Sequence, residues 1–149
     1  MTPNPAAPQG PATHTAHRPS ILFVCVKNGG KSQMAQALMR QLAGDSVRVT
    51  SGGTHPGTAL NALAVQSLEA VGASVAGQSP QLVTPELMRA ADRVVVLGQE
   101  AQLPEVEGVR VERWITDEPS LRGIEGMERM ELVRDDIRAR VAELLVSLR

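Results

Sequence analysis

The sequence predicts an α/β fold, a three-layer sandwich in which a short parallel sheet of about four strands lies between helices. Two continuous apolar runs, at residues 21–26 and 93–98, are typical of strands that are buried on both faces of a sheet. Other segments carry apolar residues at three- and four-residue steps, which indicates helices. Strands that alternate with helices form right-handed crossovers, and such crossovers produce a parallel sheet covered on both sides.

The first elements follow an N-terminal stretch of different composition. Residues 1–19 hold five of the ten prolines and no acidic residue, and we expect a disordered tail there. After the strand at 21–26, the pattern predicts a helix over about residues 34–42, which Gly44 can end. A short second strand is expected around residues 47–51.

The alternation continues in the second half of the chain. Asn61 is suited to cap a helix that ends at Gly72, and Thr84 with Pro85 has the cap and first-turn proline of another helix. After the strand at 93–98, residues 109–114 alternate like a further strand. The clearest helix closes the chain, with apolar residues at positions 130, 133, 137, 141, 144 and 148.

Composition limits the function of the single domain that the pattern predicts over residues 20–149. One cysteine excludes an internal disulfide and a Cys-rich zinc site, and we expect no bound metal. One tryptophan, one phenylalanine and a net charge of −1 offer neither a stacking platform nor a basic field for nucleic acid. The apolar runs are too short to span a bilayer and no signal-peptide segment is evident, so we expect a cytoplasmic protein without a membrane partner.

The segment from Cys25 to Ser32 is the candidate functional site. It joins the predicted first strand to the following helix, at the sheet edge where ligands bind in parallel α/β folds. Successive backbone N–H groups of such a turn, together with the helix dipole, form a site for a tetrahedral oxyanion. Gly29 and Gly30 allow close approach of a ligand, and Asn28 tolerates the left-handed conformation and can tie the loop to itself.

Cys25 has the surroundings of a nucleophile. A helix N-terminus and nearby cations favour the thiolate form, and the Ser32 hydroxyl is placed to donate to it. The chain has thirteen arginines and only two lysines, Lys27 and Lys31, and both lie within six residues of Cys25. A buried core thiol flanked by surface lysines is the structural alternative. A nucleotide-binding loop is excluded, because cysteine occupies position 25 where that motif needs glycine.

The segment Cys-x5-Lys-Ser resembles the phosphate loop Cys-x5-Arg-Ser/Thr of low-molecular-weight protein tyrosine phosphatases and of the arsenate reductases built on the same fold. The resemblance extends over residues 51–54, 60–65, 82–87, 91–98 and 114–119. It is greatest with the single-cysteine arsenate reductases, the actinobacterial arsenate–mycothiol transferases. These similarly carry Asn-Gly-Gly-Lys-Ser-Gln-Met-Ala, an Arg-Trp…Glu-Pro segment and Gly-Met-Glu-Arg-Met.

The resemblance implies a role for each residue of the loop. Cys25 would be the nucleophile, Ser32 would stabilise its thiolate, and the oxyanion would lie against Val26, Lys27, Asn28, Gly29 and Gly30. Lys31 stands where the family has an arginine, and lysine supplies charge without the planar fork that grips two oxygens.

The family's general acid is an aspartate that precedes a proline. Here Glu118 precedes Pro119 and is the first candidate, with Asp117 as its rival; a solvated acidic turn without a catalytic role is the third possibility. Downstream, Arg122, Arg129 and Arg134 are expected to be solvated surface charges rather than contacts to a substrate.

Two features favour arsenate over phosphotyrosine as the substrate. No tyrosine exists in the chain and residues 118–121 supply no aromatic wall, and Lys31 lacks the bidentate grip that supports phosphoryl transfer.

No second cysteine can resolve a cysteine–arsenic adduct within the chain, so an external thiol is required. The resemblance implies mycothiol as the co-substrate, with no bound cofactor, a mycoredoxin acting downstream, and phosphate or sulfate as competing anions. The alternatives are a low-molecular-weight protein tyrosine phosphatase and a non-catalytic oxyanion-sensing module.

Overall fold

The structure, a computed structural model, describes residues 18–148. Residues 1–17 of the predicted tail, and Arg149, lie outside the described residues. The predicted tail extends two residues too far, because Arg18 and Pro19 are held by the domain. The guanidinium of Arg18 donates to the carbonyl of Asp45 at 2.9 Å, and the carbonyl of Pro19 accepts from the Arg48 amide at 2.8 Å.

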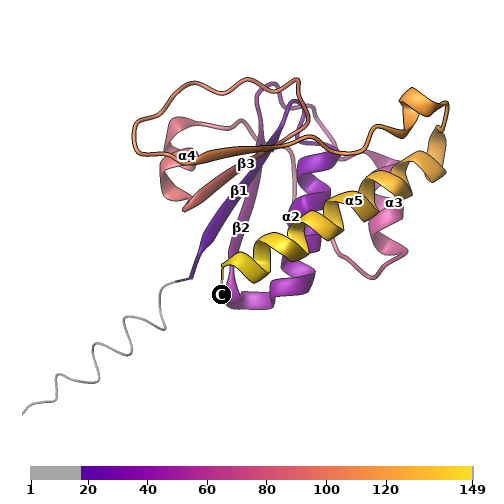
Figure 1. Ribbon diagram of the computed structural model, residues 1–149, viewed down its shortest axis with the longest axis horizontal. Coiled ribbons are helices and arrows are strands. Elements are labelled where there is room, and N and C mark those ends of the chain that lie inside the picture. Colours follow the sequence, from indigo (N-terminus) through magenta and orange to yellow (C-terminus); the bar gives the residue numbers. More distant parts are fainter. Residues whose placement is uncertain (1–17, 149) are drawn as a thin grey trace, which may run out of the picture.

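The sheet confirms the predicted fold class. In the described residues it has four strands, β1 (Ser20–Cys25), β2 (Arg48–Gly53), β3 (Arg93–Leu97) and β4 (Val111–Trp114), in the order β2-β1-β3-β4. All neighbouring pairs are parallel, and β1 lies inside the sheet (Figure 1). Because Cys25 pairs with Gly53 of β2, the segments that follow these two strands leave the sheet side by side.

The helices lie close to their predicted positions. They are α2 (Lys31–Ala43), α3 (Ala62–Glu69), α4 (Pro85–Ala90) and α5 (Gly126–Ser147), with short 3-10 turns at Gly44–Ser46 and Pro119–Arg122. The predicted caps are confirmed, since the Asn61 side chain accepts from the Ala64 amide and the Thr84 hydroxyl from the Leu87 amide. α3 ends three residues before Gly72, and α5 begins four residues before the first apolar position of its predicted stripe.

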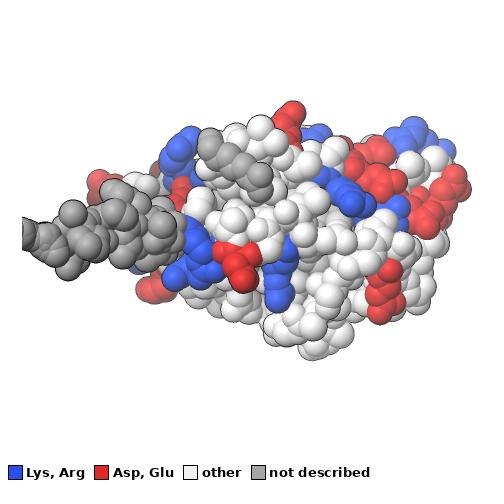
Figure 2. Space-filling view, turned by 90° about the horizontal axis from the view of Figure 1, so that it is seen from below, with Lys and Arg blue, Asp and Glu red and all other residues white. Residues whose placement is uncertain are grey.

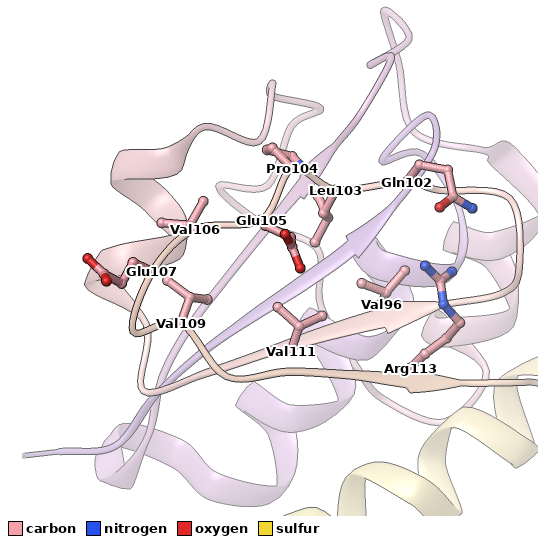
Figure 3. Close-up of a pocket in the computed structure, with 10 residues that line it drawn as sticks. All are labelled: Val96, Gln102, Leu103, Pro104, Glu105, Val106, Glu107, Val109, Val111 and Arg113. Atoms are coloured by element: carbon pink, nitrogen blue, oxygen red, sulfur yellow. The ribbon is translucent and has the colours of Figure 1, made fainter.

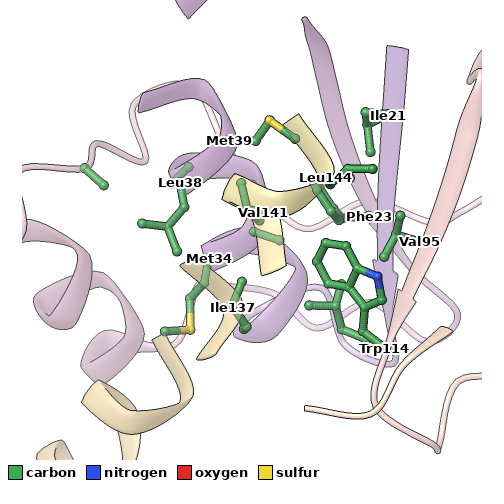
Figure 4. Packing of buried hydrophobic residues seen from close by; sticks show 14 of the residues in the cluster. Ile21, Phe23, Met34, Leu38, Met39, Val95, Trp114, Ile137, Val141 and Leu144 are labelled. Carbon is green, nitrogen blue, oxygen red and sulfur yellow. The ribbon is translucent and has the colours of Figure 1, made fainter. Parts of the chain in front are cut away.

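Two apolar cores, one on each face of the sheet, account for the three layers. On one face α2 and α5 cover the sheet, and α3 packs against these two helices. Phe23 and Trp114 meet on this face with ring centroids 5.8 Å apart, among Met34, Ile137 and Val141 (Figure 4). On the other face, Met88 of α4 and Ala101 pack against Leu22, Val24, Val94 and Val96. None of the helices in the described residues is both long and apolar enough to cross a bilayer.

The connection from β3 to β4 is anchored by Arg113. Its guanidinium donates to the carbonyls of Gly98 at 2.7 Å and Ala101 at 2.8 Å. This connection lines a cavity of about 720 Å³. Figure 3 shows its lining residues, with Val96 and Val111 on the sheet side and Leu103 on the loop side. No residue of the 25–32 segment lines this cavity. The anchored connection therefore sets where Gly98 and its neighbours stand beside the β1–α2 loop.

Candidate oxyanion-binding active site

The loop between β1 and α2 lies at the carboxyl edge of the sheet, as predicted. Cys25 is the last residue of β1 and is half-buried, and Lys31 is the first residue of α2. Asn28 has φ +53°, and among the described residues it is the only one other than glycine with a positive φ. The left-handed conformation predicted for Asn28 is confirmed, and its side chain is fully buried.

A second segment, residues 54–61, holds the outer side of this loop through its backbone. The amides of Thr54, His55, Gly57 and Asn61 donate at 2.8–3.1 Å to the carbonyls of Cys25, Val26, Lys27 and Gly29, in that order. In a planar trans peptide the N–H group points opposite to the carbonyl. The N–H groups that follow these carbonyls are therefore directed to the inner side of the loop.

The inner side of the loop carries unused donors. Within the described part of the chain, the amides of residues 27–32 donate to no backbone or side-chain acceptor. They surround the N-terminus of α2, a 13-residue helix whose dipole favours an anion at this end. The geometry is that of a cradle for a tetrahedral oxyanion. Val26 and Gly30 are half-buried in it, whereas Lys27 is exposed at its edge.

Asn28 determines how the Ser32 hydroxyl is used. The amide of Gln81 donates to Asn28 Oδ1 at 2.9 Å, which fixes the orientation of the Asn28 side chain. Asn28 Nδ2 then donates to Ser32 Oγ at 2.7 Å. Since Ser32 Oγ accepts this bond, its single hydrogen is free for Cys25 Sγ, 2.8 Å away. The hydroxyl is thus arranged to donate to a Cys25 thiolate, as the sequence predicts.

Gly53 and Gln81 support the loop and were missed by the sequence analysis. A Cβ at Gly53 would lie 2.6 Å from the carbonyl oxygen of Val26 and 3.0 Å from the Asn28 amide nitrogen and Cβ. Only glycine therefore lets β2 pass this close to the loop. The signal was present in the Ser-Gly-Gly-Thr segment at residues 51–54, but its meaning depends on the pairing of Cys25 with Gly53.

Lys31 connects the loop to Glu118. Its Nζ lies 2.5 Å from Glu118 Oε1, and both side chains are partly buried. A Cβ at Gly98 would meet Lys31 Nζ at 3.4 Å and Glu100 Oε1 at 3.1 Å, so Lys31 also runs past the end of β3. The structure thus brings the predicted acid Glu118 to the predicted clamp Lys31.

Asp117 has a different partner. Arg122 grips both of its carboxylate oxygens, at 2.8 and 3.2 Å, and this hydrogen-bonded pair lowers the pKa of Asp117. The amide of Asp117 donates to Asp136 Oδ2 at 2.9 Å, which attaches the segment to α5. An aspartate held in its ionised form is poorly suited to donate a proton.

Arg134 corrects one expectation, since it is buried rather than a solvated surface charge. Its guanidinium donates to the carbonyl of Ser67 at 2.8 Å and pairs with Asp135, so it joins α5 to α3.

Elsewhere, acidic and basic side chains are interspersed on the face shown in Figure 2. Among the described residues no group of three or more His, Cys, Asp or Glu side chains could hold a metal ion.

Comparison with known proteins identifies the family to which the chain is similar. The family described as low molecular weight phosphotyrosine protein phosphatase matches residues 20–149. A Halobacterium salinarum protein, provisionally named an arsenate reductase, is 34% identical over 127 residues, which cover 82% of this chain and 87% of the relative. An arsenate reductase of Bacillus subtilis is 31% identical over 131 residues, covering 83% of this chain and 92% of the relative.

Solved structures share the same architecture. The thioredoxin-dependent arsenate reductase Cg_ArsC1′ of Corynebacterium glutamicum matches with a TM-score of 0.75 and 29% identity over 93% of this chain. This chain spans 65% of the length of that protein. The tyrosine phosphatase Wzb of Escherichia coli K30 has the same fold, with a TM-score of 0.74 at 19% identity over 89% of this chain and 100% of its own.

Two glycine substitutions test the packing of the loop. Gly53→Ala forces a Cβ against the Val26 carbonyl, so we expect it to displace the loop and weaken binding of phosphate about tenfold or more. Gly57→Ala is the matched control, because a Cβ there meets nothing within 4 Å. Isothermal calorimetry with phosphate measures both variants, and circular dichroism checks that each is folded. Equal binding by the folded Gly53→Ala variant and the wild type would contradict the proposed cradle.

Proposed function

This chain belongs to the low-molecular-weight phosphotyrosine protein phosphatase family, and from that premise we propose that it is an arsenate reductase that transfers arsenate to an external thiol, mycothiol in particular. The observation that carries the proposal is the solitary Cys25, which lies beside a ring of unused amides and accepts from Ser32. The chain holds no second cysteine to complete a relay. An external thiol must therefore take the arsenic from the site, and the proposal assigns this role to a small thiol.

The relatives support the choice of arsenate. Proteins named as arsenate reductases are 31–34% identical to this chain over more than four-fifths of its length. Lysine at position 31 in place of arginine removes the bidentate grip that assists phosphoryl transfer. Leu121, in the turn after the acidic pair, is exposed and offers no aromatic wall for a phosphotyrosine ring.

In the proposed first step, hydrogen arsenate binds to the amides of residues 27–32, and the Cys25 thiolate attacks arsenic. A sulfur–arsenic bond forms while one arsenic–oxygen bond breaks. Lys31 turns from Glu118 toward the anion, and the freed Glu118 carboxylate takes up a proton from water. This proton then passes to the departing oxygen, which leaves as water. The cradle holds the remaining oxygens, because its donors are positioned before the anion arrives.

In the second step, the thiol of mycothiol attacks the same arsenic atom. The bond to Cys25 breaks, and the thiol proton passes to Glu118, so that the acid is restored. Cys25 leaves as a thiolate that accepts a hydrogen bond from the Ser32 hydroxyl, whose oxygen is held by Asn28. Arsenic leaves as an arseno-mycothiol adduct still in its pentavalent state. A separate mycoredoxin would then reduce it.

The first experiment incubates the protein with arsenate and mycothiol and detects arseno-mycothiol by mass spectrometry. We expect the adduct with the wild type and none above background with Cys25→Ser, because serine is a far weaker nucleophile. Turnover of an aryl phosphate in place of the adduct would establish a phosphatase instead. Tight binding of arsenate with neither reaction would establish a non-catalytic oxyanion sensor.

A second experiment separates the two candidate acids. We expect Glu118→Gln to lower kcat for arsenate by roughly a hundredfold, the usual effect of removing a general acid, and Asp117→Asn to lower it less than about fivefold. A larger loss in Asp117→Asn, measured in the same steady-state assay, would reverse the assignment.

The pH dependence of stability provides an independent check on Asp117. Arg122 lowers the pKa of Asp117 in the folded chain, so this pair stabilises the fold above the ordinary aspartate pKa of about 4. That contribution is lost as the pH falls through the lowered pKa. In urea titrations, the wild type and Asp117→Asn should therefore become more alike below about pH 4.

A further inference from the structure

A cavity of about 230 Å³ opens beside Glu118, the partner of Lys31, and the cavity itself has no role in the steps above. Its walls are residues 98–100, which follow β3, and Ile115, Thr116, Glu118 and Leu121, which follow β4. Glu118 belongs both to this wall and to the ion pair with Lys31. A molecule in the cavity therefore lies next to the place where arsenate would react.

Thr116 indicates that the cavity accepts a polar ligand. This side chain is only 4% exposed, and its Oγ1 has no hydrogen-bond partner among the described residues. A buried hydroxyl without a partner costs free energy and is uncommon in folded proteins. Oγ1 is closed to solvent in the structure, and a turn of the Thr116 side chain toward the cavity that it lines would bring this oxygen within reach of a ligand hydroxyl or amide.

The size of the cavity suits part of a ligand. Water occupies about 30 Å³ per molecule in the liquid, so 230 Å³ holds a group the size of a sugar ring. Complete small-molecule sites are larger, roughly 300–1,000 Å³. The arsenate itself belongs in the adjacent loop. The cavity thus matches the non-reacting portion of a second substrate.

The acidic residues that line the cavity disfavour a thiol that carries a carboxylate. Glu100 and Glu118 line it, and no lysine or arginine is among its lining residues. The nearby cations are already engaged, since Lys31 pairs with Glu118 before arsenate binds and with the anion afterwards, and Arg113 donates to two backbone carbonyls. A ligand carboxylate there would face two like charges in addition to the bound arsenate.

We propose that this cavity binds the non-reacting part of the thiol co-substrate and selects an uncharged, hydroxyl-bearing thiol over a carboxylate-bearing one. The proposal rests on the thiol-dependent function above. Mycothiol, a neutral thiol with sugar hydroxyls, is in the first class, and glutathione, with two carboxylates, is in the second. Leu121, which is 85% exposed, and the half-exposed Ile115 supply the apolar surface against which a sugar ring lies.

The test compares kcat/KM for mycothiol, glutathione and 2-mercaptoethanol, at saturating arsenate. We expect Glu100→Gln to raise the value for glutathione about tenfold, because one like charge is removed. Thr116→Val should lower the value for mycothiol about tenfold, with Thr116→Ser restoring it. Both variants should stay within about twofold of the wild type with 2-mercaptoethanol, which is too small to reach the cavity. Glu143→Gln, at an exposed carboxylate of α5, is the matched control and should change none of these values.

A surface substitution tests the same cavity without changing the buried position 116. Leu121→Trp should block the cavity and lower the value for mycothiol without changing that for 2-mercaptoethanol. Val146→Trp, at an exposed position near the far end of α5, should change neither. Unreactive S-methyl mycothiol should shift the NMR signals of residues 98–100 and Thr116.

Three outcomes would overturn the proposal or its premise. If mycothiol and glutathione respond alike to Glu100→Gln and Leu121→Trp, the cavity does not select the thiol. If S-methyl mycothiol shifts signals only elsewhere in the chain, the binding site is wrong. If no thiol supports turnover of arsenate in the wild type, the proposed function itself fails.

Discussion

The candidate site depends on the orientation of one buried side chain, the amide of Asn28. Its oxygen accepts from the Gln81 backbone, and its nitrogen consequently donates to Ser32. That donation leaves the Ser32 hydroxyl only its hydrogen to offer to Cys25. Hydrogen bonds to a charged group are stronger than those to a neutral one, so the Ser32 hydroxyl is placed where a thiolate nucleophile would use it. Reversing the Asn28 amide would turn the serine hydroxyl away from the sulfur.

The remainder of the fold keeps Asn28 in this position. Its left-handed backbone turns the loop, and the absence of a side chain at Gly53 lets β2 lie against it. Residues 54–61 run beside the loop, and their backbone amides donate hydrogen bonds to the loop carbonyls on its outer side. The amides proposed to hold the anion are therefore positioned by the parallel pairing of β1 and β2.

Sequence patterns predicted most of the architecture and the centre of the site. Apolar runs and cap residues such as Asn61 and Thr84 are local signals, and the strands and helices formed where these signals place them. Asn28 and Ser32 were identifiable because the properties of a loop between a strand and a helix are also local. The contact of Lys31 with Glu118 joins residues 87 positions apart, and no local rule specifies such a contact. Similarly, the spacing of apolar residues in α5 cannot show that the Arg134 guanidinium donates to the Ser67 carbonyl. The cavity lined by Thr116 exists only because β3 and β4 are paired.

Alkylation of Cys25 tests most directly the claim that this loop binds a tetrahedral oxyanion at the thiolate. Because Cys25 is the only cysteine of the chain, iodoacetamide labelling followed by mass spectrometry reports on this single sulfur. We predict that arsenate and phosphate slow the labelling in a saturable manner, whereas sodium chloride at equal ionic strength does not. A labelling rate that arsenate and phosphate leave unchanged would contradict the account, since the amides of residues 27–32 would then not hold the anion over Cys25.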